Sequence, residues 1–257
     1  MDLKISTILG TVWKYELEGG SAKITGYEGA PGGSLLIPNE LDGYTVTSIG
    51  KQAFENCYNL ISAVIPDGVE CIGYGAFLNC ERLTKIDIPG SVNCIEEYTF
   101  RNCYSLSHVA IPNGVECIKF CTFENCGNLS SVDIPGSANC IEECAFRNCE
   151  SLTRVCIPDS MKHIGSYAFK YCFSLTSITI PNSVNTIGDC AFSGCYDLAE
   201  VTIPESVKYI GYQAFNKYIG IPSIDNSLSK LTLIVKEGSF AEQYAKQNGI
   251  VYSFAKA

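Results

Sequence analysis

Residues Ile180–Thr202 read IPNSVNTIGDCAFSGCYDLAEVT, and most of the chain repeats this stretch. An Ile-Pro pair recurs every 23 residues, from Ile65-Pro66 to Ile203-Pro204. A phenylalanine keeps the same step at Phe54, Phe77, Phe100, Phe123, Phe146, Phe169, Phe192 and Phe215. A fixed period of this length indicates a solenoid, in which each repeat forms one coil and buries its apolar side against the next coil.

The first part of each unit predicts a strand with one buried side. Leu175, Ile178 and Ile180 are apolar, and Ser177 and Thr179 stand between them as polar residues. Successive side chains of a strand point to opposite faces, so the apolar residues should face the core and the two polar ones the solvent.

The rest of the unit predicts a turn, a second short extended piece and a short helix. Pro181 should end the strand because proline has no N–H to donate to a neighbouring strand. Residues 184–187 return apolar side chains to the core, and Gly188 should break the direction of the chain. Phe192 and Cys195 then follow at helical spacing, over a length that allows only one or two turns of helix.

These patterns divide the chain into three parts. Residues 1–37 predict an N-terminal cap, a β-hairpin whose Trp13 covers the open end of the core. Residues 38–218 form the array of eight coils, and residues 219–257 form a C-terminal cap that begins with an irregular polar insertion over 219–229.

The C-terminal cap predicts the order strand, helix, strand. Residues 231–235 form the first strand and residues 250–254 the second. Between them, Ser239 and Glu242 have the spacing of a capping box that opens a helix, and Gly249 should terminate it.

A second, longer period is superimposed on the first. Residues 65–110 and 111–156 are identical at 28 of 46 positions, which indicates duplication of a two-coil unit. A site that needs unique residues is not expected inside copied coils, so the duplication favours a scaffold.

The unit over Leu175–Cys195, L-x-x-V-x-I-P-x-S-V-x-x-I-G-x-x-A-F-x-x-C with small departures, resembles the leucine-rich repeats of the BspA-like, or Treponema pallidum, class. The resemblance covers roughly residues 12–254, because ITGYEG, DGYTVTSIG and EGSFAEQYAKQNGI resemble the terminal segments of that family. It implies a parallel strand lining a concave face, a surface or secreted protein that binds other macromolecules, and no catalytic residue. The abundant cysteine and the lack of a visible signal peptide depart from the family pattern.

The predicted fold is therefore an α/β repeat solenoid, a leucine-rich-repeat-like right-handed coil. A parallel sheet lies on the concave face with short helical turns opposite, a β-hairpin forms the N-terminal cap, and strand, helix and strand form the C-terminal cap. We expect a monomer.

Charge and hydropathy exclude two classes of partner. The net charge is −9 and the 18 Lys and Arg are scattered, whereas nucleic-acid binding needs a basic stripe. No apolar run approaches the roughly 18–20 residues that span a bilayer. Residues 1–10 are too short and too polar for a signal peptide, so the chain is either intracellular or a mature form that begins after its signal.

The 15 cysteines fall into columns of the repeat. One column occupies the position three residues after the phenylalanine, and we expect its members to be buried thiols rather than disulfides. These residues are Cys57, Cys80, Cys103, Cys126, Cys149, Cys172 and Cys195. The eight other cysteines are the redox-sensitive candidates.

A second column raises the question of a metal. Cys71, Cys94, Cys117 and Cys140 continue as His163, and thiolate and imidazole are zinc ligands. Residues of one column lie in a straight line, and a line cannot surround an ion. We therefore expect neither a metal site nor another cofactor.

The sequence contains no recognisable catalytic motif. It has two histidines, His108 and His163, and lacks HExxH, GxSxG and a phosphate-binding glycine loop. We therefore expect a protein that is not an enzyme.

The outward strand positions are the candidate binding residues. We single out a mixed-charge patch and two hydroxyl residues beside it: Lys85, Asp87, His108, Asp133, Arg154, Ser177 and Thr179. An ordinary solvated sheet face with weak ion pairs is the alternative interpretation.

The leading functional hypothesis is a binding module at the cell surface or outside the cell that uses its concave face against a protein or glycan, one that a host could supply. The alternatives are a structural spacer within a larger surface protein and a cytoplasmic interaction scaffold. Adhesion is the activity that the leading hypothesis suggests.

Overall fold

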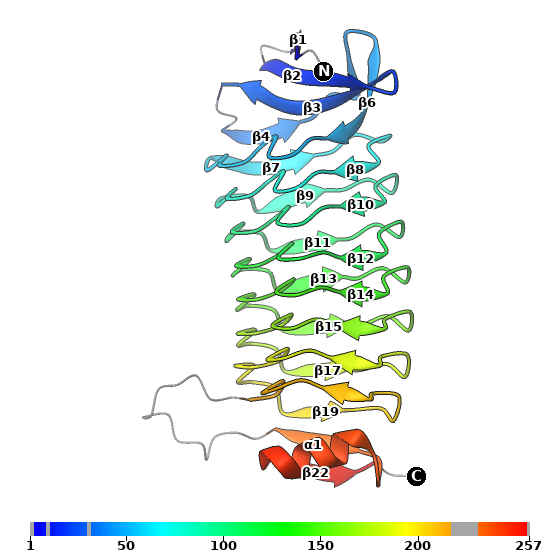
Figure 1. Ribbon diagram of the computed structural model, residues 1–257. Coiled ribbons are helices and arrows are strands. Elements are labelled where there is room, and N and C mark those ends of the chain that lie inside the picture. Colours follow the sequence, from blue (N-terminus) through cyan, green and yellow to red (C-terminus); the bar gives the residue numbers. More distant parts are fainter. Residues whose placement is uncertain (1–2, 9–10, 30–31, 217–230, 256–257) are drawn as a thin grey trace.

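Each coil carries two short strands, and most of them pair in parallel with the matching strands of the neighbouring coils. The computed structural model describes residues 3–8, 11–29, 32–216 and 231–255, and the stacked coils form an elongated β-solenoid (Figure 1). The predicted repeat coil with parallel strands is confirmed. Concavity of the strand side stays a prediction.

The longer strands of the coils form what we call the strand face. They are β7 (Leu60–Val64), β9 (Lys85–Asp87), β11 (His108–Ala110), β13 (Ser131–Asp133), β15 (Arg154–Cys156), β17 (Ser177–Thr179) and β19 (Glu200–Thr202). Each of these strands buries its apolar side chain and exposes most of the side chains beside it, as the alternation predicts.

The second extended piece is a two-residue strand on the opposite side of each coil, which we call the second face. Its members are β8 (Cys71–Ile72), β10 (Cys94–Ile95), β12 (Cys117–Ile118), β14 (Cys140–Ile141), β16 (His163–Ile164), β18 (Thr186–Ile187) and β20 (Tyr209–Ile210). The isoleucine of each pair is buried.

Hydrogen-bonded pairing is interrupted on both faces between the same two coils. On the strand face, β9 ends one sheet and β11 begins another. On the second face, β10 ends one sheet and β12 begins another. We call this boundary between residues 85–95 and 108–118 the coil junction. The strand face is interrupted once more between β13 and β15.

Stacked phenylalanine rings fill the centre of the solenoid. Consecutive rings from Phe54 to Phe215 have centroids 5.1–5.7 Å apart, and the step from Phe100 to Phe123, which crosses the coil junction, is 5.4 Å. All these rings are buried. The core is therefore continuous even where the sheets are not.

The predicted helical turns opposite the strands are wrong. The segments around each phenylalanine are tight turns, and α1 (Phe240–Asn248) is the one α-helix of the described residues. Left-handed residues recur there, such as Tyr98 (φ 60°), Cys121 (φ 53°) and Asn125 (φ 63°). A residue with positive φ cannot continue a right-handed helix, so apolar spacing alone gave a misleading signal.

An asparagine ladder runs beside the phenylalanine ladder and was not predicted. Each side-chain amide donates to the amide oxygen of the preceding coil over 2.6–2.7 Å, from Asn148 through Asn125, Asn102 and Asn79 to Asn56. Asparagine suits this column because it tolerates left-handed φ and carries both a donor and an acceptor.

The N-terminal end is covered by antiparallel strands. Strands β1 (Lys4–Ile8), β2 (Thr11–Glu18) and β3 (Ser21–Glu28) pair in that order, and β1 was not foreseen. Trp13 is buried with its ring edge-on to Phe54, 6.3 Å away. The chain then enters the coils through three more strands, β4 (Gly33–Leu36), β5 (Glu40–Leu41) and β6 (Tyr44–Ile49).

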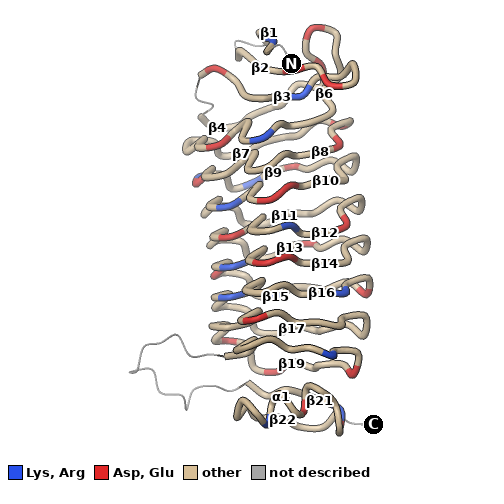
Figure 2. Tube along the Cα trace, in the orientation of Figure 1, with Lys and Arg blue, Asp and Glu red and all other residues tan. Residues whose placement is uncertain are grey.

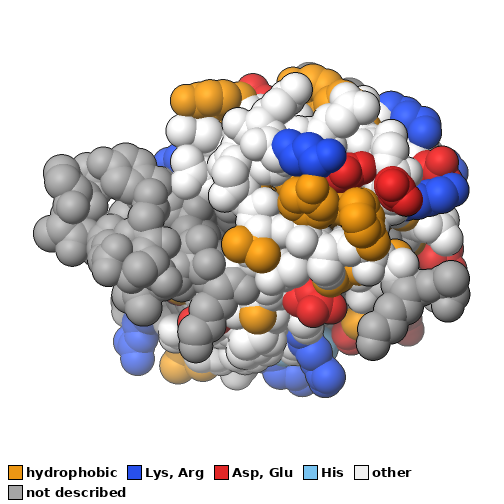
Figure 3. All heavy atoms as spheres, turned by 90° about the horizontal axis from the view of Figure 1, so that it is seen from below, with side chains coloured by type: hydrophobic (Ala, Val, Ile, Leu, Met, Phe, Trp, Pro, Cys, Tyr) orange, Lys and Arg blue, Asp and Glu red, His pale blue; other side chains and the backbone are white. Residues whose placement is uncertain are grey.

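The C-terminal end is covered by β21 (Thr232–Val235), α1 and β22 (Val251–Phe254). The Ser239 side chain accepts the Glu242 backbone N–H over 3.2 Å, and Gly249 ends the helix with φ 65°. From this end, small groups of hydrophobic side chains lie among charged and polar ones (Figure 3). The predicted insertion over 219–229 lies outside the described residues.

The motif-column cysteines carry buried thiols, as predicted. Six of them donate S–H to the carbonyl oxygen of a phenylalanine in the preceding coil, with Sγ to oxygen distances of 3.2–3.3 Å, as from Cys126 to Phe100. Burial also raises the pKa of the Cys126, Cys149 and Cys172 thiols above the ordinary value, which keeps them neutral.

One pair of the second cysteine column, which belongs to the redox-sensitive candidates, is oxidised. Cys117 and Cys140 form a disulfide. The parallel register places their Cα atoms 4.9 Å apart, within the range that a disulfide spans. Unlike the motif column, these two side chains are partly exposed, and among the described residues no backbone carbonyl accepts a hydrogen bond from them.

Along the described part of the chain, charged residues of both signs are interspersed and no stripe of one sign is seen (Figure 2). Among the described residues, none of the helical structure reaches the length and apolar character required to traverse a bilayer.

Replacing Phe146 by alanine should lower the free energy of unfolding by about 3–5 kcal/mol, because it opens a cavity between two stacked rings. Those rings belong to Phe123, at 5.3 Å, and Phe169, at 5.2 Å. Urea unfolding followed by circular dichroism measures the loss. Tyr104→Ala, at a site 46% exposed, is the matched control and should change stability by less than about 0.5 kcal/mol. Equal losses in the two variants would contradict the ladder's role.

The denatured, unreduced protein should titrate 13 thiols, because two of the 15 cysteines are joined. In the native protein, a thiol reagent should react with the exposed Cys156 and leave the motif column untouched, since buried neutral thiols are poor nucleophiles. Alkylation and mass spectrometry identify the modified residues. A count of 15 without reductant would show that the disulfide is not formed.

Candidate functional site

The strand face places all seven predicted binding residues at the surface. Lys85 and Asp87 lie on β9, His108 on β11 and Asp133 on β13. Arg154 follows on β15, with Ser177 and Thr179 together on β17. All seven side chains belong to exposed residues.

The first four of these residues form contacts with their neighbours. Lys85 Nζ is 3.0 Å from Asp87 Oδ2 within one strand. His108 Nε2 lies 3.6 Å from Asp133 Oδ2, and His108 Nδ1 lies 3.0 Å from Ser131 Oγ. These side chains are about half or more exposed, so solvent screens the ion pairs and they add little to stability.

A hollow of about 500 Å³ lies on the strand face at the coil junction. It is lined by Thr84, Lys85, Ile86, Asp87, Ile88, Ser107, His108 and Ala110. Three of the seven predicted residues therefore share one depression, at a place where the strands on either side are not hydrogen-bonded into one sheet.

The remaining predicted residues lie apart from this hollow. Arg154 pairs in register with Ser177, and Thr179 pairs with Cys156, within the separate sheet that begins at β15. Among the described residues, no ion pair involves Arg154. The predicted patch is therefore two groups of side chains along one face.

A ladder of hydroxyl groups borders the strand face and was missed in the sequence. Side-chain oxygens donate to the backbone carbonyl of the preceding coil over 3.0–3.3 Å, at Thr84, Ser107, Ser130, Thr153 and Thr176. The sequence feature that could have revealed this ladder is the Ser or Thr that follows the repeat leucine in these coils. The hydroxyls add a polar edge to the candidate surface.

The contact of His108 with Ser131 and Asp133 has the residue types of a catalytic triad without its environment. Asp133 is 74% exposed and cannot orient the imidazole as a buried carboxylate does. The adjoining backbone belongs to the parallel pairing of β11 with β13, so this part of the strand face presents no obvious oxyanion hole. The arrangement suits hydrogen bonding to a ligand better than acyl transfer.

Three groups of cysteine and glutamate could coordinate a metal ion in the described part of the chain. They are Cys71 with Cys94 and Glu96, Cys117 with Cys140 and Glu142, and Cys121 with Glu124 and Cys144. The two glutamates of the second face, at 96 and 142, occupy the position of the repeat glycine, as at Gly73 and Gly165. A cysteine column by itself is a straight line, but a glutamate at this neighbouring position adds a ligand that lies off the line.

The buried third group is unsuited to a cation. Glu124 Oε2 lies 2.7 Å from Arg101 Nε, and Glu124 Oε1 lies 3.5 Å from Arg147 Nη1. The carboxylate is already neutralised by two guanidinium groups, and their net positive charge would repel a metal ion.

Comparison with known proteins gives consistent matches over nearly the whole chain. A profile described as "BspA type Leucine rich repeat region" matches six copies, over residues 40–137 and 117–245. No protein with curated function matches.

Two solved structures are similar over most of this chain. The T. pallidum leucine-rich repeat protein TpLRR is 27% identical, with a TM-score of 0.59 over 95% of this chain and 97% of that one. A leucine-rich cell surface protein from Faecalibacterium prausnitzii A2-165 is 28% identical, with a TM-score of 0.59 over 82% of this chain and 73% of that one.

Proposed function

The chain belongs to the BspA-type leucine-rich repeat family, and from that membership we propose that it is a non-enzymatic binding module of the cell surface whose partner is a protein or glycan. The family suggests a protein-binding repeat module. The kind of ligand, the surface location and the monomeric state are parts of the proposal.

The observation that carries the proposal is the hollow at the coil junction. Where its strands pair, a solenoid strand face offers a ligand side chains above a sheet, but here Lys85, Asp87 and His108 line a depression of about 500 Å³. A cation, an anion and an imidazole beside hydroxyl groups can match the donors and acceptors of a sugar or a polar protein loop.

The surface location draws its support from similar proteins. The F. prausnitzii structure is described as a cell surface protein, and its similarity covers 82% of this chain. A cytoplasmic scaffold is the alternative. Localisation by immunogold labelling of intact and permeabilised cells separates the two.

Replacing Lys85, His108 and Arg154 together by alanine should weaken binding by at least about tenfold, since it removes three polar anchors from the proposed interface. A glycan array and a pull-down with the intact chain identify the ligand, and surface plasmon resonance measures its Kd. The side chains are exposed, so circular dichroism and thermal unfolding should be unchanged.

The matched control removes the same number of basic and imidazole groups from the second face. Lys162, His163 and Lys208 are exposed there, and their alanine variant should bind as the parent does. Equal weakening by both triple variants would indicate a charge effect rather than a site. If the first triple variant binds the ligand with the Kd of the parent protein, the binding site lies elsewhere. If neither screen finds a ligand, the result favours the structural spacer.

A further inference from the structure

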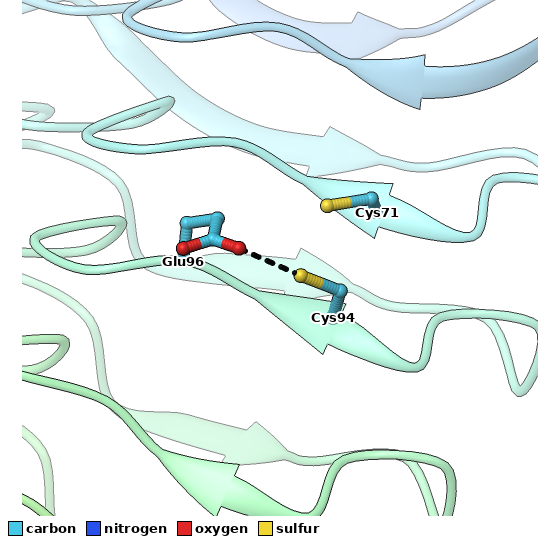
Figure 4. Close-up of side chains that lie close together, drawn as sticks. All are labelled: Cys71, Cys94 and Glu96. Carbon is cyan, nitrogen blue, oxygen red and sulfur yellow. Dashed lines mark hydrogen bonds between the residues drawn. The ribbon is translucent and has the colours of Figure 1, made fainter.

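The geometry points to a second site, which the proposed binding function does not use: we propose that Cys71, Cys94 and Glu96 bind one thiophilic divalent cation, Zn²⁺ by the chemistry of the ligands. Their three ligand atoms lie within 4.8 Å of one another on the second face (Figure 4). Cys94 Sγ is 3.0 Å from Glu96 Oε1.

Backbone register brings the three side chains together. Cys71 and Cys94 are direct partners in the parallel pair of β8 and β10. Glu96 follows Cys94 by two residues, which places both on the same side of an extended chain. The two sulfurs define the column, and the carboxylate lies off it, so the three groups form a triangle instead of a line.

The size of this triangle suits zinc. Tetrahedral Zn²⁺, with Zn–S about 2.3 Å and Zn–O about 2.0–2.2 Å, holds its ligand atoms about 3.5–3.8 Å apart. The distances of 3.0 Å and up to 4.8 Å bracket that value, so small rotations of side chains suffice. All three residues are half-buried, which leaves a fourth position for water.

The charges around the site also balance. Two thiolates and one carboxylate carry three negative charges, and Zn²⁺ leaves one of them uncompensated. Lys119 Nζ lies 2.8 Å from Glu96 Oε1 and supplies the missing positive charge across the coil junction. Binding would release two thiol protons to solvent and form two Zn–S bonds and one Zn–O bond.

A hollow beside the site gives access to it. It measures about 380 Å³ and is lined in part by Cys94, Glu116, Cys117 and Lys119. The ion and its remaining water can therefore reach the triangle from solvent without opening the core.

The duplicated copy of the site is an internal control. Cys117, Cys140 and Glu142 lie 46 residues further on, but the two cysteines are joined as a disulfide, which provides no thiolate. Glu142 Oε2 also accepts the Phe120 backbone N–H over 2.8 Å. Gly165 stands where the first copy has Lys119, so this copy lacks the balancing cation.

Co²⁺ titration of the metal-free full chain under anaerobic conditions tests the proposal. We expect thiolate-to-cobalt charge-transfer absorption that saturates at one Co²⁺ per chain and disappears when Zn²⁺ is added. The double variant Cys71→Ser, Cys94→Ser should lose this absorption. The Glu96→Gln variant should keep it but bind Co²⁺ at least about tenfold more weakly.

Two control variants should retain the wild-type titration. One is Cys156→Ser, which removes the exposed thiol of the strand face, and the other is Cys117→Ser, Cys140→Ser, which removes the disulfide copy. Circular dichroism establishes that each variant is folded, and the near-isosteric Glu96→Gln keeps the test valid if the double serine variant does not fold.

Three results would overturn the proposal. The first is thiolate-to-cobalt absorption that persists in the Cys71→Ser, Cys94→Ser variant. The second is a Co²⁺ affinity that is unchanged in the Glu96→Gln variant. The third is a Cys71–Cys94 disulfide in the anaerobically prepared protein, detected by alkylation and mass spectrometry, because it would make this pair equivalent to its oxidised copy.

Discussion

Every side chain in the array must tolerate a counterpart 23 residues away stacked directly on it. Parallel coils in register impose this condition, and the buried columns satisfy it in three ways. Phenylalanine rings stack at 5.1–5.7 Å, asparagine amides donate to one another, and cysteine thiols donate to backbone carbonyls of the preceding coil. Each of these side chains can interact favourably with an identical residue in the next coil, so the same residue type can recur in every coil.

Like charges stacked in adjacent coils would repel one another, and a two-coil unit avoids this contact. Over residues 51–216, like charges of one column are separated by an uncharged or opposite residue, as in Glu97, Phe120, Glu143, Ser166 and Asp189. Two coils separate them by about 10 Å, roughly one Debye length at 0.1 M salt.

The one exception to this spacing is the step from Arg147 to Lys170. Lys170 Nζ there lies 5.1 Å from the ring centre of Tyr167 and 4.8 Å from that of Tyr171, so it is attracted to two aromatic faces. A repeating unit of 46 residues satisfies this electrostatic condition, which a charged column repeated every 23 residues would not.

The same stacking condition explains what could be predicted from the sequence. Buried columns such as Phe146 and Leu175, and the outward Ser177 and Thr179, depend only on periodicity and were identified from it. The left-handed φ also recurs every 23 residues, as at Tyr98, Cys121 and Cys144, but the residue types of that column vary and include few that favour this conformation. Hence the helical turns were misjudged. Glu96 was overlooked because its importance comes from replacing a glycine, which a column of cysteines does not reveal.

The coil junction is the place where stacking in register relaxes. Both sheets are interrupted there, while Asn125 still donates to Asn102 over 2.6 Å and Lys119 bridges to Glu96. The rod remains one body because its core and polar ladders cross the gap, yet its two surfaces are hollowed on opposite sides of the same coils. In a repeat protein, coils that pair in register use their strand N–H and C=O groups on one another, so these groups are not available to a ligand. A boundary where the strands pair incompletely leaves room for a hollow on each face, and Cys94 and Lys119 line the hollow beside the proposed metal site, whose Cys71–Cys94 pair itself is in register.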